Sequence, residues 1–292
     1  MIRSAAKNHK DVSVLVDPKQ YKEFLEERNK GKINESYKAK LAFEAFQHTA
    51  DYDTAISNWI SKEKDLRSTK YIESYPLIKT LRYGENPHQK AFWYGLSNIG
   101  WKSAEQLQGK ELSYNNLLDL ESALSTVLEF GYEEKDNPTI NKSASVILKH
   151  NNPCGASIGN SASQAFLNAL ECDSVSAFGG IVAFNSNVDI ETAINLKDIF
   201  LECVVAPSFD SEALEILKIK KNLRILKLSK DQLPKQKQTS TKSIMGGLLV
   251  QETDNREENI DGWISVTKNN PSKQMNLDLN FAWKICKHVK SN

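Results

Sequence analysis

Short apolar runs that alternate with amphipathic stretches constrain the fold of this chain more than any other feature. Three such runs, residues 146–148, 181–184 and 204–206, have the length of buried strands. Stretches with apolar residues at helical spacing separate them, one through Leu167 and one after Asp189. Strands that alternate with helices in this way are typical of an α/β domain whose sheet is covered. We therefore expect an α/β fold.

The first 75 residues have a different pattern, with several expected helices and one expected strand. Valines alternate along residues 12–16, where an additional leucine makes both faces apolar. We expect helices over residues 4–9, from Asp17-Pro18 toward residue 31, and over residues 37–60. One strand cannot make a sheet, so we expect the chain to begin partway through a domain.

From about residue 76 the pattern changes, and we place a second domain over residues 76–292. We expect strands over residues 77–81 and 246–250 and a polar surface loop over residues 231–242. A final amphipathic helix leads toward Asn292, where the sequence stops.

Composition excludes several classes of protein. The 292 residues fit about two domains, and their formal net charge of +1 argues against a strongly basic nucleic-acid surface. No apolar stretch approaches the roughly 18 residues of a membrane span, and no secretory signal opens the chain, so we expect a cytoplasmic protein. The four cysteines form no CxxC pair, which argues against a disulfide framework or a zinc cage.

The most informative polar residues are Lys149 and His150, which follow the apolar run 146–148. Ligands bind outside the carboxyl ends of strands in open α/β sheets, and we expect Pro153 and Gly155 to break the chain just after this one. A lysine beside a histidine disfavours protonation of the imidazole and leaves a neutral base. The alternative is a solvated lysine and a histidine that hydrogen-bonds the turn.

Other polar clusters each have a functional and a structural interpretation. Arg82 could bind a phosphate with Tyr83 stacked beside it, or it could be an exposed loop arginine. Gly179 could let the backbone approach a ligand, or it could serve a tight turn. Lys7 would ordinarily be a surface lysine. Cys154 and His150 could form a nucleophile pair, although no orienting third residue is evident and no dinucleotide or P-loop glycine motif is present.

Seven ordered stretches resemble one family closely, the bifunctional purine-biosynthesis proteins that join AICAR formyltransferase to IMP cyclohydrolase. They are RSAAKNH (3–9), LRYGENPHQ (81–89), LSYNNLLD (112–119), KHNNPCG (149–155), SAFGG (176–180), GGLLVQ (246–251) and VKSN (289–292). The resemblance runs along essentially the whole chain.

The resemblance implies two consecutive reactions on small-molecule substrates. A formyl group moves from the co-substrate 10-formyltetrahydrofolate to the amine of AICAR, giving FAICAR, and ring closure of FAICAR then gives IMP. It implies no required metal, no nucleic acid or membrane partner, and a homodimer. It also implies a partial Rossmann-like cyclohydrolase domain with linking helices over residues 1–75 and a partial formyltransferase domain resembling the cytidine-deaminase fold over residues 76–292.

The resemblance also assigns roles to individual residues. The expected catalytic residues are His150 as the base, Lys149 as a stabilising cation, Asn292 as an orienting group, and Lys7 as the acid/base of the cyclohydrolase. The expected substrate-binding residues are Arg82, Tyr83, Asn116, Gly179 and Glu202. Because further pocket residues of the family lie outside the sequence, we expect an internal fragment. The alternative is a non-catalytic nucleotide-binding or dimerising remnant of that enzyme.

Overall fold

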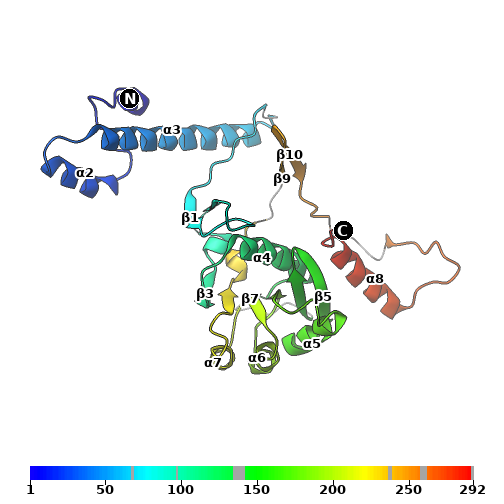
Figure 1. The fold of residues 1–292 in the computed structure, drawn as a ribbon. Coiled ribbons are helices and arrows are strands. Elements are labelled where there is room, and N and C mark those ends of the chain that lie inside the picture. Colours follow the sequence, from blue (N-terminus) through cyan, green and yellow to red (C-terminus); the bar gives the residue numbers. More distant parts are fainter. Residues whose placement is uncertain (67–68, 97, 134–141, 236–238, 257–261, 291–292) are drawn as a thin grey trace. The chain divides into compact units, whose positions relative to one another are not determined.

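The computed structural model describes residues 1–66, 69–96, 98–133, 142–235, 239–256 and 262–290, which form two compact units, Met1–Pro76 and Leu77–Asn292 (Figure 1). We describe each unit by itself. Among the described residues, no helix combines the length and apolar character that crossing a membrane requires.

The first unit consists of helices. They are α1 (Ile2–Lys7), α2 (Gln20–Asn29) and the long α3 (Glu35–Glu63). The Asn34 side chain accepts a hydrogen bond from the Tyr37 N–H and so caps α3, satisfying a donor that the first turn leaves unpaired. A small core of Ala6, Ala42 and Ala45 holds α1 against α3.

The strand expected over residues 12–16 is wrong. Within the described part of the chain, these residues form no strand and pair in no sheet. Val14 and Val16 instead pack against the alanine core of the first unit. The alternating valines therefore reflect apolar contact with helices, not membership of a sheet.

The second unit is built on a six-stranded mixed sheet in the order β3-β8-β7-β6-β4-β5. The strands are β3 (Glu105–Gln108), β4 (Ser143–Lys149), β5 (Asn152–Gly159), β6 (Gly180–Phe184), β7 (Leu201–Ala206) and β8 (Arg224–Lys227). Strands β6, β7 and β8 are parallel, β4 runs antiparallel to both β5 and β6, and β3 runs antiparallel to β8. The expectation of an α/β fold is confirmed.

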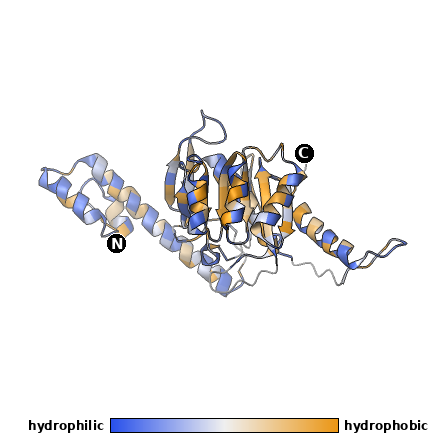
Figure 2. Cartoon of the chain, turned by 90° about the horizontal axis from the view of Figure 1, so that it is seen from below, coloured by the Kyte–Doolittle hydropathy of each residue, from blue (hydrophilic) through white to orange (hydrophobic). Residues whose placement is uncertain are grey.

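Helices cover both faces of this sheet. The helix α4 (Tyr114–Val127) shares one apolar core with alternate strand residues such as Val146 and Leu148. The opposite core joins Ile147 to α5 (Ala162–Cys172), α6 (Ile190–Lys197) and α7 (Ser211–Leu217). Strand residues 146–148 therefore face α4 and the α5–α7 layer in turn, which explains why their run is apolar throughout. The hydrophobic colouring is accordingly strongest in the strands (Figure 2).

Two hairpins and a helix complete the second unit. The hairpins pair β1 (Leu77–Leu81) with β2 (Ala91–Tyr94) and β9 (Thr239–Ile244) with β10 (Gly247–Glu252). The loop expected over residues 231–242 is wrong from residue 239 onward, because that part pairs with β10. The helix α8 (Lys273–Cys286) stacks Phe281 on Phe130, with ring centroids 5.2 Å apart.

The contact between β5 and α5 leaves no room for a side chain at Gly155. A Cβ added there would overlap the carbonyl oxygen of Ala169, a backbone atom that cannot move without shifting α5. We predict that Gly155→Ala lowers the free energy of unfolding by about 3 kcal/mol, because overpacking against backbone forces strain. Urea denaturation measures this change.

Gly247→Ala is the matched control, since the nearest atom to an added Cβ is a side-chain carbon of Ile244 at 3.8 Å. It should change the unfolding free energy little. Equal effects of the two substitutions would contradict the close packing of β5 on α5.

Candidate functional site

A tight turn joins β4 to β5 and carries the histidine singled out from the sequence. His150 and Asn151 have φ angles of 51° and 60°, and Lys149 pairs with Asn152 across the turn. Two consecutive left-handed residues between paired strands are the geometry of a two-residue hairpin turn. The expectation that Pro153 and Gly155 break the chain here is wrong, because both lie in β5.

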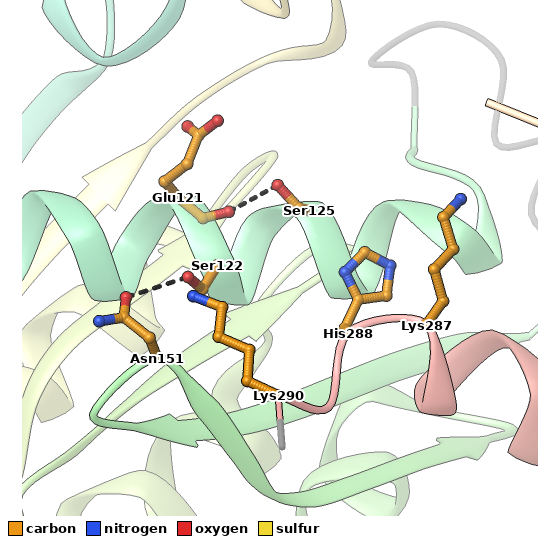
Figure 3. Close-up of a pocket in the computed structure, with 7 residues that line it drawn as sticks. All are labelled: Glu121, Ser122, Ser125, Asn151, Lys287, His288 and Lys290. Carbon is orange, nitrogen blue, oxygen red and sulfur yellow. Dashed lines mark hydrogen bonds between the residues drawn. The ribbon is translucent and has the colours of Figure 1, made fainter. Parts of the chain in front are cut away.

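Left-handed backbone costs a residue with a side chain about 1–2 kcal/mol, and histidine and asparagine tolerate it better than most residues. The turn therefore needs support from its surroundings, and the adjoining helix α4 provides it. The Asp119 carboxylate accepts a hydrogen bond from the Asn151 N–H at 2.8 Å. One turn later along α4, the Ser122 hydroxyl donates to the Asn151 side-chain oxygen at 3.1 Å (Figure 3).

The turn lies at a different edge of the sheet from the one expected. Because β4 runs antiparallel to β6, with Leu148 opposite Ile181, its carboxyl end meets the amino ends of the parallel strands. The rule that ligands bind at carboxyl ends concerns parallel strands and does not apply to β4. The candidate site is therefore at the amino edge of β6, β7 and β8.

Lys149 and Gly179 meet at this edge through the loop before β6. The Lys149 ammonium donates to the Phe178 carbonyl at 2.9 Å, so it is not simply solvated. Gly179 has a φ of 75°, and its N–H donates to the Phe200 carbonyl at 2.8 Å. A ligand contact through this N–H would have to replace that hydrogen bond.

Asn116 and Glu202 also meet at this edge. The Asn116 side chain is 2% exposed, accepts from the Ser113 N–H as part of the α4 capping box, and donates to the Glu202 carboxylate at 2.8 Å. Arg224, the first residue of β8, lies 3.8 Å from the same carboxylate. A cation and an amide thus share one partly exposed carboxylate.

Asp119 is the acidic group closest to the turn. Burial raises the pKa of its carboxyl, while the Asn151 N–H and the nearby charges of His150 and Lys290 oppose the rise. Glu202 adds a like charge that raises the pKa further. These interactions bring Asp119, His150, Glu202 and Lys290 into one electrostatic cluster.

A hollow of about 220 Å³ adjoins this cluster between α4 and the segment after α8. Ser122, Ser125, Asn151 and Lys290 help to line it, and the Lys290 side chain reaches toward Ser122 and Asn151 (Figure 3). His150 does not line this hollow. Glu129 holds the segment after α8 in place.

Glu129 forms an ion pair with Lys287 at 2.8 Å, and its carboxylate is hydrogen-bonded to the His288 ring at 3.0 Å. Burial raises the pKa of the Glu129 carboxyl, but hydrogen bonds from His288 and Lys287 outweigh this and lower it to about 2. The carboxylate therefore stays charged at neutral pH and holds the end of α8 against residues 128–130.

Arg82 and Tyr83 lie after β1, where the Arg82 guanidinium carbon is 5.4 Å from the centre of the Tyr83 ring. Arg82 is exposed, and no contact described for it reaches the turn at His150. Lys79 in the same hairpin pairs with Glu111, whose carbonyl accepts from Arg224. Through Glu111 and Arg224, these contacts link the hairpin of β1 and β2 to the Glu202 carboxylate.

Two of the expected catalytic residues remain predictions. Lys7 is an exposed residue of α1 in the first unit, and Asn292 lies outside the described residues. The nucleophile pair of Cys154 and His150 does not form, because the Cys154 thiol donates to the Ile147 carbonyl and burial raises its pKa. In the described ranges, no group of three or more His, Cys, Asp and Glu side chains could hold a metal ion.

Sequence reasoning did not single out Asp119 and Arg224. Asp119 follows Asn116 by three residues, which places both on one face of a helix, and this spacing could have drawn attention to it. Arg224 is the first residue of β8, a four-residue strand for which the sequence pattern gives no clear prediction. Its proximity to Glu202 depends on the order of strands in the sheet, which spacing alone does not give.

Comparison with known proteins identifies the family. The AICARFT/IMPCHase bienzyme family matches residues 5–292. The chain belongs to this family. The resemblance based on the seven stretches is therefore confirmed.

Its relatives in the family include the bifunctional purine biosynthesis protein PurH of Prochlorococcus marinus strain MIT 9312, which is 86% identical over 292 residues. The protein of the same name from strain CCMP1986 / NIES-2087 / MED4 is 85% identical. Each alignment covers 100% of this chain and 56% of the relative, so the chain spans little more than half the length of these curated relatives. The solved structure of Acinetobacter baumannii RibD, form 1, covers 37% of this chain and 33% of its own at 20% identity, with a TM-score of 0.27, too low to define a shared fold.

The buried contact between Asn116 and Glu202 gives a prediction. Asn116→Asp keeps the oxygen that caps α4 but places a second carboxylate against Glu202, so we expect a loss of about 2 kcal/mol in unfolding free energy at neutral pH. Adding Glu202→Gln removes the like charge and should restore most of the loss. Urea denaturation of the single and double variants measures this coupling, and a double variant no more stable than Asn116→Asp would contradict it.

Proposed function

We propose that the amino edge of the sheet in the second unit is the formyl-transfer site, where a formyl group moves from 10-formyltetrahydrofolate to the amine of AICAR. The observation that carries this proposal is the convergence of Lys149, His150, Gly179, Asn116 and Glu202, which are spread over 87 sequence positions, at one edge. Membership of the bienzyme family supports the choice of reaction.

The chemistry requires a base and a correctly placed acceptor. The AICAR amine is a poor nucleophile, because its lone pair is delocalised into the imidazole and carboxamide. As it attacks the formyl carbon, the His150 imidazole takes its proton; the bond between that carbon and the folate nitrogen then breaks, and the folate nitrogen gains a proton. The exposed turn supports this role, since it leaves the imidazole open to a ligand.

Lys149 stabilises the negative charge that develops on the formyl oxygen. Its ammonium already lies at the Phe178 carbonyl, directly before Gly179, where we expect the backbone to contact the nucleotide. Glu202 binds a polar group of the nucleotide, and Asn116 contributes to that binding through its hydrogen bond to the Glu202 carboxylate. Arg82 with Tyr83 binds the phosphate. Asn292 orients the acceptor and formyl groups.

We assign the first unit to the other activity. Residues 1–75 form the C-terminal part of a Rossmann-like IMP cyclohydrolase domain, in which Lys7 acts as acid/base in the closure of FAICAR to IMP. Residues 76–292 form the N-terminal part of a formyltransferase domain that resembles the cytidine-deaminase fold. The family resemblance further favours a cytoplasmic homodimer with formyl-transfer sites across the interface.

The second candidate is a non-catalytic remnant that binds nucleotide or a second copy. This candidate is considered because the chain spans 56% of the length of its curated relatives. Turnover of AICAR by the 292-residue chain separates the two, because measurable FAICAR would exclude a remnant.

The His150 role is tested by a substitution that keeps the turn. Asparagine tolerates left-handed backbone, so His150→Asn should preserve the hairpin and remove the base. We predict that kcat for formyl transfer falls about 10²- to 10⁴-fold. The measurement uses a protein as long as the curated relatives. Cyclohydrolase activity should be unchanged and serves as the internal control. Retained formyl transfer would rule out His150 as the base.

A further inference from the structure

Asp119 has two unusual features for a helix surface residue. Its side chain is half-buried, which raises the pKa of its carboxyl, and its hydrogen bond goes to the backbone of a turn 32 positions later in the chain. That turn contains His150, the residue before the amide it holds. Asp119 itself makes no described hydrogen bond to the imidazole.

The hydrogen bond from the Asn151 N–H to Asp119 holds a left-handed backbone conformation that few residues with a side chain adopt. His150 and Asn151 both have positive φ, and the direction of the imidazole follows from the φ and ψ of its own residue. A donor at Asn151 fixed to α4 prevents the peptide between these residues from rotating. Ser122 fixes the same residue through its side chain, so two successive turns of α4 hold the hairpin tip.

The helix end that carries Asp119 is itself well anchored. Asn116, one turn earlier, is buried. Its side chain accepts a hydrogen bond from the N–H of Ser113, the N-cap residue of α4, and donates one to Glu202 on β7. Leu120, directly after Asp119, is fully buried in the core against the sheet. A rigid helix thus connects the nucleotide-binding positions to the turn.

We infer that Asp119 is a positioning residue for formyl transfer, which holds the turn so that the His150 imidazole faces the AICAR amine. This inference rests on the proposed function. It predicts that the hydrogen bond matters more than the negative charge, because the asparagine side chain also offers an oxygen to the Asn151 N–H.

The experiment compares Asp119→Ala with Asp119→Asn in the protein at the length of its curated relatives. Asp119→Ala should lower kcat for formyl transfer about 10- to 100-fold, the cost of a misplaced catalytic group, with KM for AICAR within about threefold. Asp119→Asn should keep kcat within about threefold of the unsubstituted protein. Exchange of the Asn151 amide hydrogen, followed by NMR, should accelerate about tenfold in Asp119→Ala alone.

Asp189→Asn is the matched control. Asp189 also accepts a hydrogen bond from a backbone N–H, that of Thr192 at the start of α6, on the opposite face of the sheet. This substitution should leave kcat unchanged. Urea denaturation of every variant separates a local change at the turn from a general loss of stability.

Three outcomes would overturn the inference. Unchanged kcat in Asp119→Ala despite faster exchange of the Asn151 amide would show that the turn need not be held. Equal losses in Asp119→Asn and Asp119→Ala would show that charge, not the hydrogen bond, is required. A rise in KM for AICAR without a fall in kcat would make Asp119 a binding residue. Failure of the proposed function looks different, since His150→Asn would then retain formyl transfer.

Discussion

The two-residue left-handed turn between β4 and β5 is the constraint on which the second unit depends. It reverses the chain so that Lys149 pairs with Asn152, and it lets the apolar strand β4 lie between β5 and β6. The same reversal leaves His150 at the hairpin tip, beyond the last ladder pair. This turn, in which both residues have positive φ, persists because α4 holds it by two hydrogen bonds.

Placing the turn at the amino edge changes which groups can act together. The N-terminal half of α4 contributes Asn116 and Asp119, the loop before β6 contributes Gly179, and the start of β7 contributes Glu202. Lys149, Arg224 and Lys290 bring positive charge to that edge, and Asp119 and Glu202 bring negative charge. Such a mixture suits a polar nucleotide with both donors and acceptors better than it suits a simple anion.

The sequence allowed the covered strands to be identified, because residues 146–148 and 181–184 face apolar layers on both sides. It did not reveal the direction of β4, since an apolar run has the same pattern in a parallel and an antiparallel strand. Proline and glycine in KHNNPCG indicated a break, yet pairing with β4 and contact with α5 accommodate both in a strand. The sequence pattern itself singles out Lys149, His150, Arg82, Tyr83 and Gly179, and the family resemblance adds Asn116, Glu202 and Asn292. Asp119 and Arg224 emerge only from contacts in the folded chain.

In the proposed formyl-transfer site, the imidazole of His150 faces the AICAR nucleotide at this edge. The most direct measurement is an NMR titration with AICAR of the protein carrying ¹³C-labelled histidine, with the His150 signal assigned by its absence in His150→Asn. The His150 signal should shift in proportion to the fraction of protein that has AICAR bound. Saturation with AICAR that leaves the His150 signal in place would contradict it.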